Sequence, residues 1–307
     1  MILSSPRVDA SDHSEFRAIR LSIEEQLRQL ITAPAAAPSN LRDAMGHALL
    51  APSKRVRPMM LYLVAEPSNG LASAALDAGS AVEMIHTASL ILDDLPCMDD
   101  AELRRQRPTT HVAFGEATAI LSAIALLAQA FNILAELEGV SAETRTRLSQ
   151  ILSNAVGWNG LAAGQELDIN GAGNGNGGFH GQNEIERVNW LKTGALFEAA
   201  VEMGAVLGNR SEAQIEAVRK FAKHFGLAYQ ALDDLRDSTS SVAELGKDVN
   251  KDKDKVTSVT RFGLRRAQQE CKHHLGLADD ALVESGVAAA PLRALVSQLF
   301  SVRVPVI

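Results

Sequence analysis

The sequence predicts an all-α protein that folds as a single-domain bundle of helices. Apolar residues make up 46% of the 307 residues and are mostly alanine and leucine, whereas aromatic residues make up only 4%. This composition favours helices that pack closely through small side chains. Long segments have apolar residues at helical spacing, with no strand pattern, internal repeat or domain linker. We therefore expect one domain over residues 1–307, with a flexible polar tail over 1–14.

Each predicted helix is marked by apolar residues that recur every three or four positions. The first, for example, places Phe16, Ile23 and Leu30 on one stripe. Residues 32–40 hold two prolines and predict a connector, and residues 170–181 hold six glycines and predict a surface loop. The predicted helices span residues 15–31, 41–50, 58–64, 71–92, 117–137, 142–167, 184–207, 212–236, 264–275 and 292–299.

Charge and cysteine content exclude several classes of protein. The net charge of -7 predicts no affinity for nucleic acid or for an anionic membrane. The two cysteines, Cys97 and Cys271, are too few for a disulfide framework and suit a reducing, cytoplasmic location. The first residues contain no apolar signal core, and we expect no apolar run long enough, without charges, to anchor the chain in a membrane.

The first candidate site is an acidic cluster at the end of the apolar helix 71–92. Asp93 and Asp94 lie on its last turn, and Pro96 ends the helix and turns Asp99 back toward them. Carboxylates share a poorly solvated site only when something neutralises them. Mg²⁺ does this with oxygen ligands and keeps positions for water and phosphate. The alternative is a solvated helix end that is acidic by chance.

A second acidic cluster favours the magnesium hypothesis. Another apolar helix runs into Asp233, Asp234 and Asp237, and the first and last of these lie four apart on one helix face. Like charges at that spacing repel unless a cation bridges them. Two such clusters predict two walls of one cavity that holds Mg²⁺ around a diphosphate.

Basic side chains near the first cluster suit the binding of phosphate anions. Lys54, Arg55 and Arg57 form a turn that suits a second anion, although a surface turn is the alternative. The paired Arg104 and Arg105 follow the first aspartates closely enough to bind phosphate bidentately.

Five further residues are candidates for ligand binding, and most of them also have a purely structural explanation. His86 lies seven positions before Asp93 on the same helix face, which favours a ligand contact over a core histidine. Lys192 and Thr193 precede a glycine that predicts a local distortion and directs both side chains inward, unless Lys192 is simply solvated. Lys247 and Lys255 lie in a polar loop that could close over a polyanion, although such charge runs are usually solvated.

Together these motifs resemble the trans-polyprenyl diphosphate synthase family over nearly the whole chain, and most closely its bacterial geranylgeranyl diphosphate synthases. The resemblance rests on their order: Lys54-Arg55-x-Arg57, Asp93-Asp94-x4-Asp99, Arg104-Arg105, Lys192-Thr193, Gln230, Asp233-Asp234-x2-Asp237 and Gly246-Lys247-Asp248. It implies an isoprenoid-synthase bundle around a central apolar cavity, and a homodimer. It also implies an Mg²⁺-dependent prenyltransferase that condenses isopentenyl diphosphate with an allylic diphosphate.

The resemblance also implies a role for each residue. By this resemblance, five residues hold the Mg²⁺ ions that bind the allylic diphosphate: Asp93, Asp94, Asp99, Asp233 and Asp237. The same diphosphate is assigned to Arg104, Lys192, Lys247 and Lys255. Isopentenyl diphosphate is assigned to Lys54, Arg57, His86 and Arg105. Thr193 and Gln230 line the reaction centre.

Product length depends on the residue five positions before the first aspartate. Farnesyl-producing members of the family have an aromatic residue there, whereas this chain has Ala88, followed by Ser89. Position 88 lies roughly 7.5 Å down the helix from Asp93, at about 1.5 Å per residue. Alanine leaves room for another isoprene unit, with Met84 or Ile85 as the floor, so we expect a twenty-carbon product.

The chain departs from the family pattern in three places. Pro52 and Ser53 replace two glycines, Gln106 replaces the glycine after the paired arginines, and Asp254 stands where a glycine is usual. Glycine lets the backbone approach a ligand closely, so these changes could alter loop shape or phosphate binding.

Three rival functions are weighed against geranylgeranyl diphosphate synthesis. A farnesyl diphosphate synthase would stop one isoprene unit earlier. A class I terpene cyclase would have no isopentenyl site, which the cations at 54, 57 and 105 argue against. A non-catalytic subunit would tend to lose an aspartate motif, and both are intact here.

Overall fold

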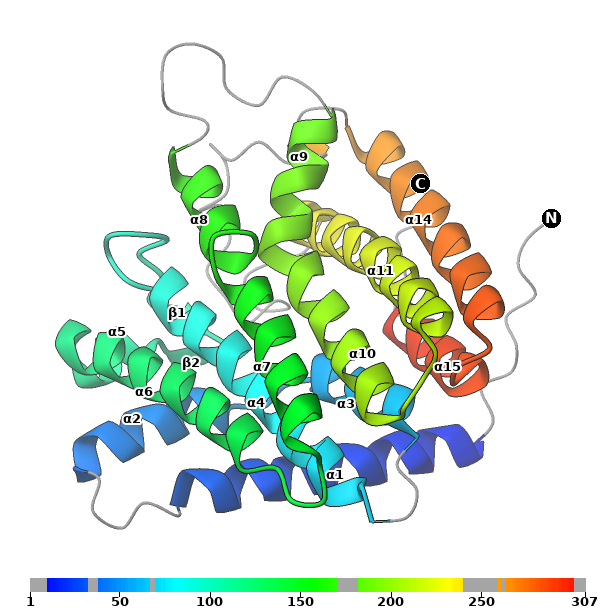
Figure 1. Ribbon diagram of the computed structural model, residues 1–307. Coiled ribbons are helices and arrows are strands. Elements are labelled where there is room, and N and C mark those ends of the chain that lie inside the picture. Colours follow the sequence, from blue (N-terminus) through cyan, green and yellow to red (C-terminus); the bar gives the residue numbers. More distant parts are fainter. Residues whose placement is uncertain are drawn as a thin grey trace.

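A computed structural model describes residues 10–32, 38–66, 70–170, 182–239, 259–260 and 263–300. The described chain is a bundle of helices, and the predicted all-α class is confirmed (Figure 1). The helices are α1 (Ala10–Thr32), α2 (Ser39–Leu49), α3 (Val56–Ala65), α4 (Ala72–Asp93), α5 (Thr110–Phe114), α6 (Glu116–Ala135), α7 (Ala142–Val156), α8 (Leu161–Asn170), α9 (Gln182–Asn189), α10 (Ala195–Leu207), α11 (Glu212–Thr239), α14 (Leu264–Ser285) and α15 (Ala289–Phe300).

Helix α4 is the central element of the fold. It packs against α1, α2, α3, α6 and α10, and most of its residues are buried. Its small residues, such as Ala78, Gly79 and Ala81, allow close approach, and a side chain at 79 would lie 3.0 Å from Pro58. The last turn of α4 therefore places Asp93 at a defined point on the bundle. Helix α11, which ends with the second acidic cluster, packs along α14 and α10.

Several predicted boundaries were wrong. The helix predicted over 142–167 is two helices, α7 and α8, separated by a turn at residues 157–160. At Gly160 a Cβ atom would lie 2.0 Å from the carbonyl oxygen of Ala155, so only glycine fits the turn. The predicted tail over 1–14 is too long, because α1 begins at Ala10. Pro58 lies inside the first turn of α3, where a missing N–H costs no helical hydrogen bond.

Two short strands also lie outside the prediction. β1 (Leu103–Arg104) and β2 (Arg107–Pro108) pair antiparallel as a small hairpin after the first acidic cluster. The predicted interruption near Lys192, by contrast, is present. Trp190–Gly194 forms a π-helical turn, η1, between α9 and α10.

The prediction that no apolar run could span a membrane was wrong on length and composition. Helix α6 has 20 residues and a mean hydropathy of 1.9 in its most apolar window. Only 39% of that window is buried inside the molecule, and Ile120, Leu121 and Ile124 are exposed. Core helices of soluble proteins can pass the same test. The helix therefore presents an apolar face without a partner within the described chain.

Arg55 forms the most completely satisfied ionic network in the described core. Its side chain is 1% exposed. It donates to Glu24 and Glu83 at 2.7 Å each, and to the backbone carbonyls of Leu49 at 2.7 Å and Ala51 at 3.2 Å. This guanidinium therefore joins α1, α4 and the end of α2, and it does not take part in the predicted basic turn.

We predict that Arg55→Leu lowers the free energy of unfolding by about 3–5 kcal/mol, because it leaves two carboxylates without a cation partner in a buried site. Urea unfolding monitored by circular dichroism measures this loss. The matched control is Arg28→Leu, which breaks the exposed Arg28–Glu25 pair and should cost less than about 1 kcal/mol. Equal losses in the two variants would contradict the assigned role of Arg55.

Candidate active site

The first acidic cluster is folded back on itself, as the sequence predicted. The N–H of Asp99 donates to the carbonyl oxygen of Asp93 at 2.9 Å, and the N–H of Ala101 donates to that of Asp94 at 3.2 Å. The pKa of Asp93 is raised to about 6. Burial is the main cause, the nearby Lys192 opposes the rise, and the negative charge of Asp99 adds to it. Asp93 is therefore a desolvated carboxylate that would gain from a cation.

Asp94 has a different environment. Its two oxygens accept three hydrogen bonds from Arg104, of 2.6 to 2.8 Å, and its side chain is 5% exposed. Burial raises the pKa of Asp94, and the hydrogen bonds from Arg104 oppose that rise. A metal ion at Asp94 would have to compete with Arg104 for both oxygens.

Lys192 lies at the centre of the site, on the π-helical turn η1. Its ammonium donates to Asp168 of α8 at 2.5 Å, and its charge lowers the pKa of Asp93. Gly164 lets α8 approach η1 this closely, since a Cβ atom there would lie 2.7 Å from the backbone nitrogen of Lys192. Sequence reasoning missed Asp168. Its only signal was its position one turn after Gly164 on the same helix face.

The same turn reaches the second acidic cluster through Thr193. The Thr193 hydroxyl donates to Gln230 at 2.8 Å, and the Gln230 amide donates to Asp234 at 2.8 Å. Helix α11 comes close to η1 because position 226 is glycine, where a Cβ atom would lie 2.8 Å from the Cα of Gly194. One turn of five residues therefore connects both predicted clusters, with Lys192 on one side and Thr193 on the other.

Asp233 is a partly exposed carboxylate of the second cluster. Its side chain is 43% exposed and lies 4.0 Å from Arg236. Its charge adds to the effect of burial in raising the pKa of Tyr229 to about 12. The side chain of Asp237 and the residues Lys247, Lys255 and Asp254 lie outside the described residues.

Of the predicted isopentenyl-site residues, Lys54 and Arg57 lie near Asp233, and Arg105 and His86 lie near Arg57. Burial lowers the pKa of Lys54, Arg57 and Arg105. Neighbouring cations lower each further, whereas Glu83 opposes the shift at the two arginines and Asp233 opposes it at Lys54. His86 is held well below its usual pKa by burial and by Arg57 and Arg105. Arg57 lies 4.1 Å from the ring centre of Phe197, and its Nε has no hydrogen-bond partner among the described residues. Desolvated cations that repel one another form a site for an anion.

A cavity of about 330 Å³ begins at the polar centre and extends into the bundle. Asp93 and Lys192 lie among its lining residues, and Ile85, Ala88 and Ser89 form its α4 wall. Met84 is buried but does not line this cavity, so of the two predicted floor residues only Ile85 does. Sequence reasoning missed the opposite wall, because three other helices, α6, α7 and α8, contribute it: Leu127, Val156, Leu161, Ala162 and Ile169.

Within the part of the chain that the structure describes, no three histidine, cysteine, aspartate or glutamate side chains are close enough to form a metal cage. This arrangement still suits Mg²⁺, which is usually held by one or two carboxylates together with water and substrate phosphates. The raised pKa of Asp93 beside Asp99 is the observation that fits a hard cation here.

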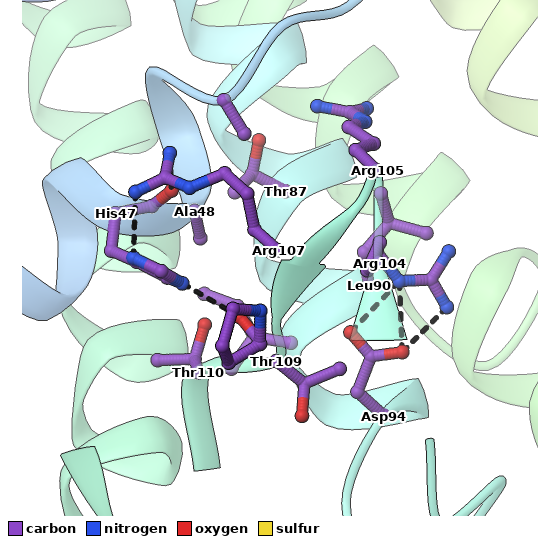
Figure 2. Close-up of a pocket in the computed structure, with 13 residues that line it drawn as sticks. His47, Ala48, Thr87, Leu90, Asp94, Arg104, Arg105, Arg107, Thr109 and Thr110 are labelled. Atoms are coloured by element: carbon purple, nitrogen blue, oxygen red, sulfur yellow. Dashed lines mark hydrogen bonds and ion pairs between the residues drawn. The ribbon is translucent and has the colours of Figure 1, made fainter. Parts of the chain in front are cut away.

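The hairpin that carries the paired arginines (Figure 2) has a strained turn. Arg105 and Gln106 both have positive φ, of 53° and 62°, a conformation that glycine adopts most readily. Gln106 is thus a true departure from the family pattern. At the departure before Lys54, the Ser53 hydroxyl donates to Glu83 and accepts from the N–H of Arg55, both at 3.3 Å.

A helical bundle in which carboxylates and buried cations surround the mouth of an apolar cavity is typical of enzymes that act on prenyl diphosphates. A family model described as polyprenyl synthetase matches residues 38–285, and the chain belongs to this family. This confirms the predicted family and, with it, the class of prenyltransferase.

Several named relatives are similar over most of their length. Geranylgeranyl diphosphate synthase of Pseudescherichia vulneris is 40% identical over 92% of this chain and 90% of its own. The enzyme of the same name from Pantoea ananas is 41% identical over 78% of this chain and 80% of its own.

Solved structures of the same fold include two with related names. A geranyltransferase from Helicobacter pylori, complexed with magnesium and isoprenyl diphosphate, superposes with a TM-score of 0.85 at 27% identity, over 95% of this chain and 99% of its own. An FPP/GFPP synthase from Zymomonas mobilis has a TM-score of 0.82 at 31% identity, over 94% and 98%.

Proposed function

We propose that this chain condenses isopentenyl diphosphate with an allylic diphosphate to give geranylgeranyl diphosphate. The observation that carries this proposal is the apolar cavity that starts at Asp93 and Lys192 and passes Ala88. It provides a water-poor path for a growing hydrocarbon chain next to groups that suit a diphosphate. The names of the relatives that are about 40% identical support the same product.

The allylic diphosphate is assigned to the acidic side of the site. Asp93, Asp99, Asp233 and Asp237 would hold Mg²⁺, and Asp94 would act mainly by orienting Arg104. Bound Mg²⁺ would offset the negative charge that grows on the departing diphosphate. Lys192, Arg104, Lys247 and Lys255 would bind the same oxygens, and Asp168 would set the position of Lys192.

Isopentenyl diphosphate is assigned to the cationic side, Lys54, Arg57, His86 and Arg105, where its phosphates would relieve the repulsion between Arg57 and Arg105 beside His86. In the reaction the allylic C–O bond breaks, the isopentenyl double bond forms the new C–C bond, and a proton leaves to the departing diphosphate. Thr193 and Gln230, already joined by a hydrogen bond, line the reaction centre. The apolar walls keep water from the carbocation.

Incubation of the purified protein with farnesyl diphosphate, isopentenyl diphosphate and Mg²⁺ tests the proposal. We expect a twenty-carbon diphosphate, identified by mass. Chains that stop at fifteen carbons would favour the farnesyl alternative. A cyclic hydrocarbon formed without isopentenyl diphosphate would indicate a terpene cyclase, and no turnover by the protein alone would indicate a non-catalytic subunit.

We predict that Ala88→Tyr shifts the product toward farnesyl diphosphate. Ala88 is completely buried and lines the cavity, so a phenol ring there would fill the path below the diphosphate site. Product masses from the two enzymes under identical conditions measure the shift. The control Ala88→Ser adds one atom and should keep the twenty-carbon product. An unchanged distribution in the tyrosine variant would refute the assigned path.

We predict that the affinity for Mg²⁺ in the absence of substrate falls below pH 6. The pKa of Asp93 is raised to about 6, so below that pH the carboxyl group is protonated and must release its proton before it can bind a cation. The dissociation constant should rise about tenfold per pH unit below 6 and stay nearly constant above pH 7. Calorimetric titration at pH 5, 6, 7 and 8 measures this. The control Asp93→Asn should bind weakly at every pH, and a constant wild-type affinity from pH 5 to 8 would exclude Asp93 as the titrating ligand.

We also propose that the whole chain is one domain and that the protein is cytoplasmic. We further propose that it forms a homodimer through the exposed apolar face of α5 and α6. The face consists of Val112, Ile120, Leu121 and Ile124, which are 41–56% exposed. Both thiols are free, which suits a reducing compartment. Sedimentation should give twice the mass of 32.8 kDa, and Leu121→Lys should shift it toward the monomer. A wild-type monomer at micromolar concentration would contradict this assembly.

A further inference from the structure

The hairpin of β1 and β2 needs more than its own hydrogen bonds to hold its position. Each strand has only two residues, and such a hairpin alone is at best marginally stable. Its turn adds strain, because Arg105 and Gln106 adopt positive φ, which is unfavourable for residues other than glycine. Contacts outside the hairpin must therefore offset that cost.

Packing beneath the hairpin is incomplete. A gap of about 30 Å³ separates the hairpin from α4 and is lined on the helix side by Thr87, Leu90 and Ile91. The Thr87 hydroxyl is buried and has no hydrogen-bond partner within the described chain. Polar contacts at the two sides of the hairpin therefore help to fix its position.

Arg104 and Arg107 are direct partners across the two strands, and each finds a partner on a different helix end. Arg104 pairs with Asp94, at the end of α4. Arg107 donates to His47 of α2 twice, to the ring Nδ1 at 2.8 Å and to the backbone carbonyl oxygen at 3.2 Å. Figure 2 shows the two pairs on opposite sides of the hairpin, with Arg105 pointing away from both.

The hydrogen bonds of His47 define its tautomer. The Nδ1 accepts from the Arg107 guanidinium, so it carries no proton. The Nε2 lies 2.8 Å from the carbonyl oxygen of Pro108, so it must be the donor. The ring also packs edge-on against Phe114, with centroids 5.4 Å apart. One imidazole thus contacts both residues of β2 and is held in place by α5.

We propose that His47 is a positioning residue: through Arg107 it fixes the hairpin so that its turn presents Arg105 to the diphosphate of isopentenyl diphosphate. This inference rests on the proposed function. Arg105 already lies near the other residues of that site, since its charge lowers the pKa of both Arg57 and His86. Asp94 holds Arg104 separately, so loss of the His47 contact would affect isopentenyl diphosphate more than the allylic substrate.

Steady-state kinetics of four variants test the proposal. His47→Leu removes both ring hydrogen bonds and should raise the KM for isopentenyl diphosphate about tenfold, with kcat and the allylic KM within twofold of wild type. His47→Asn retains an acceptor near the Nδ1 position and should stay within threefold. Arg107→Met should resemble His47→Leu, and the double variant should be no worse than either single one, because both remove the same contact.

The control is Asn40→Ala, on the same helix, whose side chain contacts Thr118 rather than the hairpin. It should leave both KM values unchanged. An unchanged isopentenyl KM in His47→Leu would overturn the proposal. Equal rises for both substrates, a defect in His47→Asn as large as in His47→Leu, or additive effects in the double variant would also overturn it.

Backbone hydrogen exchange over residues 102–109 separates this inference from the proposed function. His47→Leu should speed exchange in this segment at least tenfold, whereas Asn40→Ala should not. If the wild-type protein does not consume isopentenyl diphosphate, the proposed function fails, but the exchange result still decides whether His47 holds the hairpin. Unchanged exchange in His47→Leu would overturn the positioning role on its own.

Discussion

The structure depends on one costly arrangement: groups of like charge are gathered where water is scarce. Burial raises the pKa of Asp93 to about 6, and the same effect lowers the pKa of Lys54, Arg57, Arg105 and His86. Each shift means that the charged form is less stable in the folded protein than in water. A diphosphate with its metal ions would reverse these penalties. Relief of this desolvation penalty therefore contributes to the free energy of substrate binding.

The rest of the bundle holds these charges in place. Arg55 ties the start of α3 to α1 and α4, so that Lys54 and Arg57 on either side of it face the site. The turn η1 connects α8 and α11, because Lys192 donates to Asp168 and Thr193 donates to Gln230. Because a π-helical turn contains one extra residue, it changes the direction of successive side chains within a single turn. This allows neighbouring residues to reach Asp168 on one side and Gln230 on the other.

Local patterns were enough to predict the all-helical class, the return of Asp99 toward Asp93 and the distortion after Lys192. Each follows from helical spacing, a proline or a glycine close by in the sequence. Local patterns did not predict contacts between residues that are distant in sequence. Asp94 is held by Arg104, Arg55 turns into the core, and Asp168 reaches Lys192 across two helices. Periodicity predicts which face of a helix is buried, but tertiary packing decides which residues of other helices contact that face.

The break between α7 and α8 shows why this limit matters for product length. The sequence argument treats length as a property of Ala88 and its neighbours on α4. In the structure the cavity wall facing them includes Val156, at the end of α7, and Leu161, at the start of α8, which the sequence had placed inside one continuous helix. A straight helix would carry these two side chains along one axis, whereas the turn at Gly160 redirects the chain between them. The depth available to a growing chain is therefore set by two opposing walls, and α4 determines only one of them.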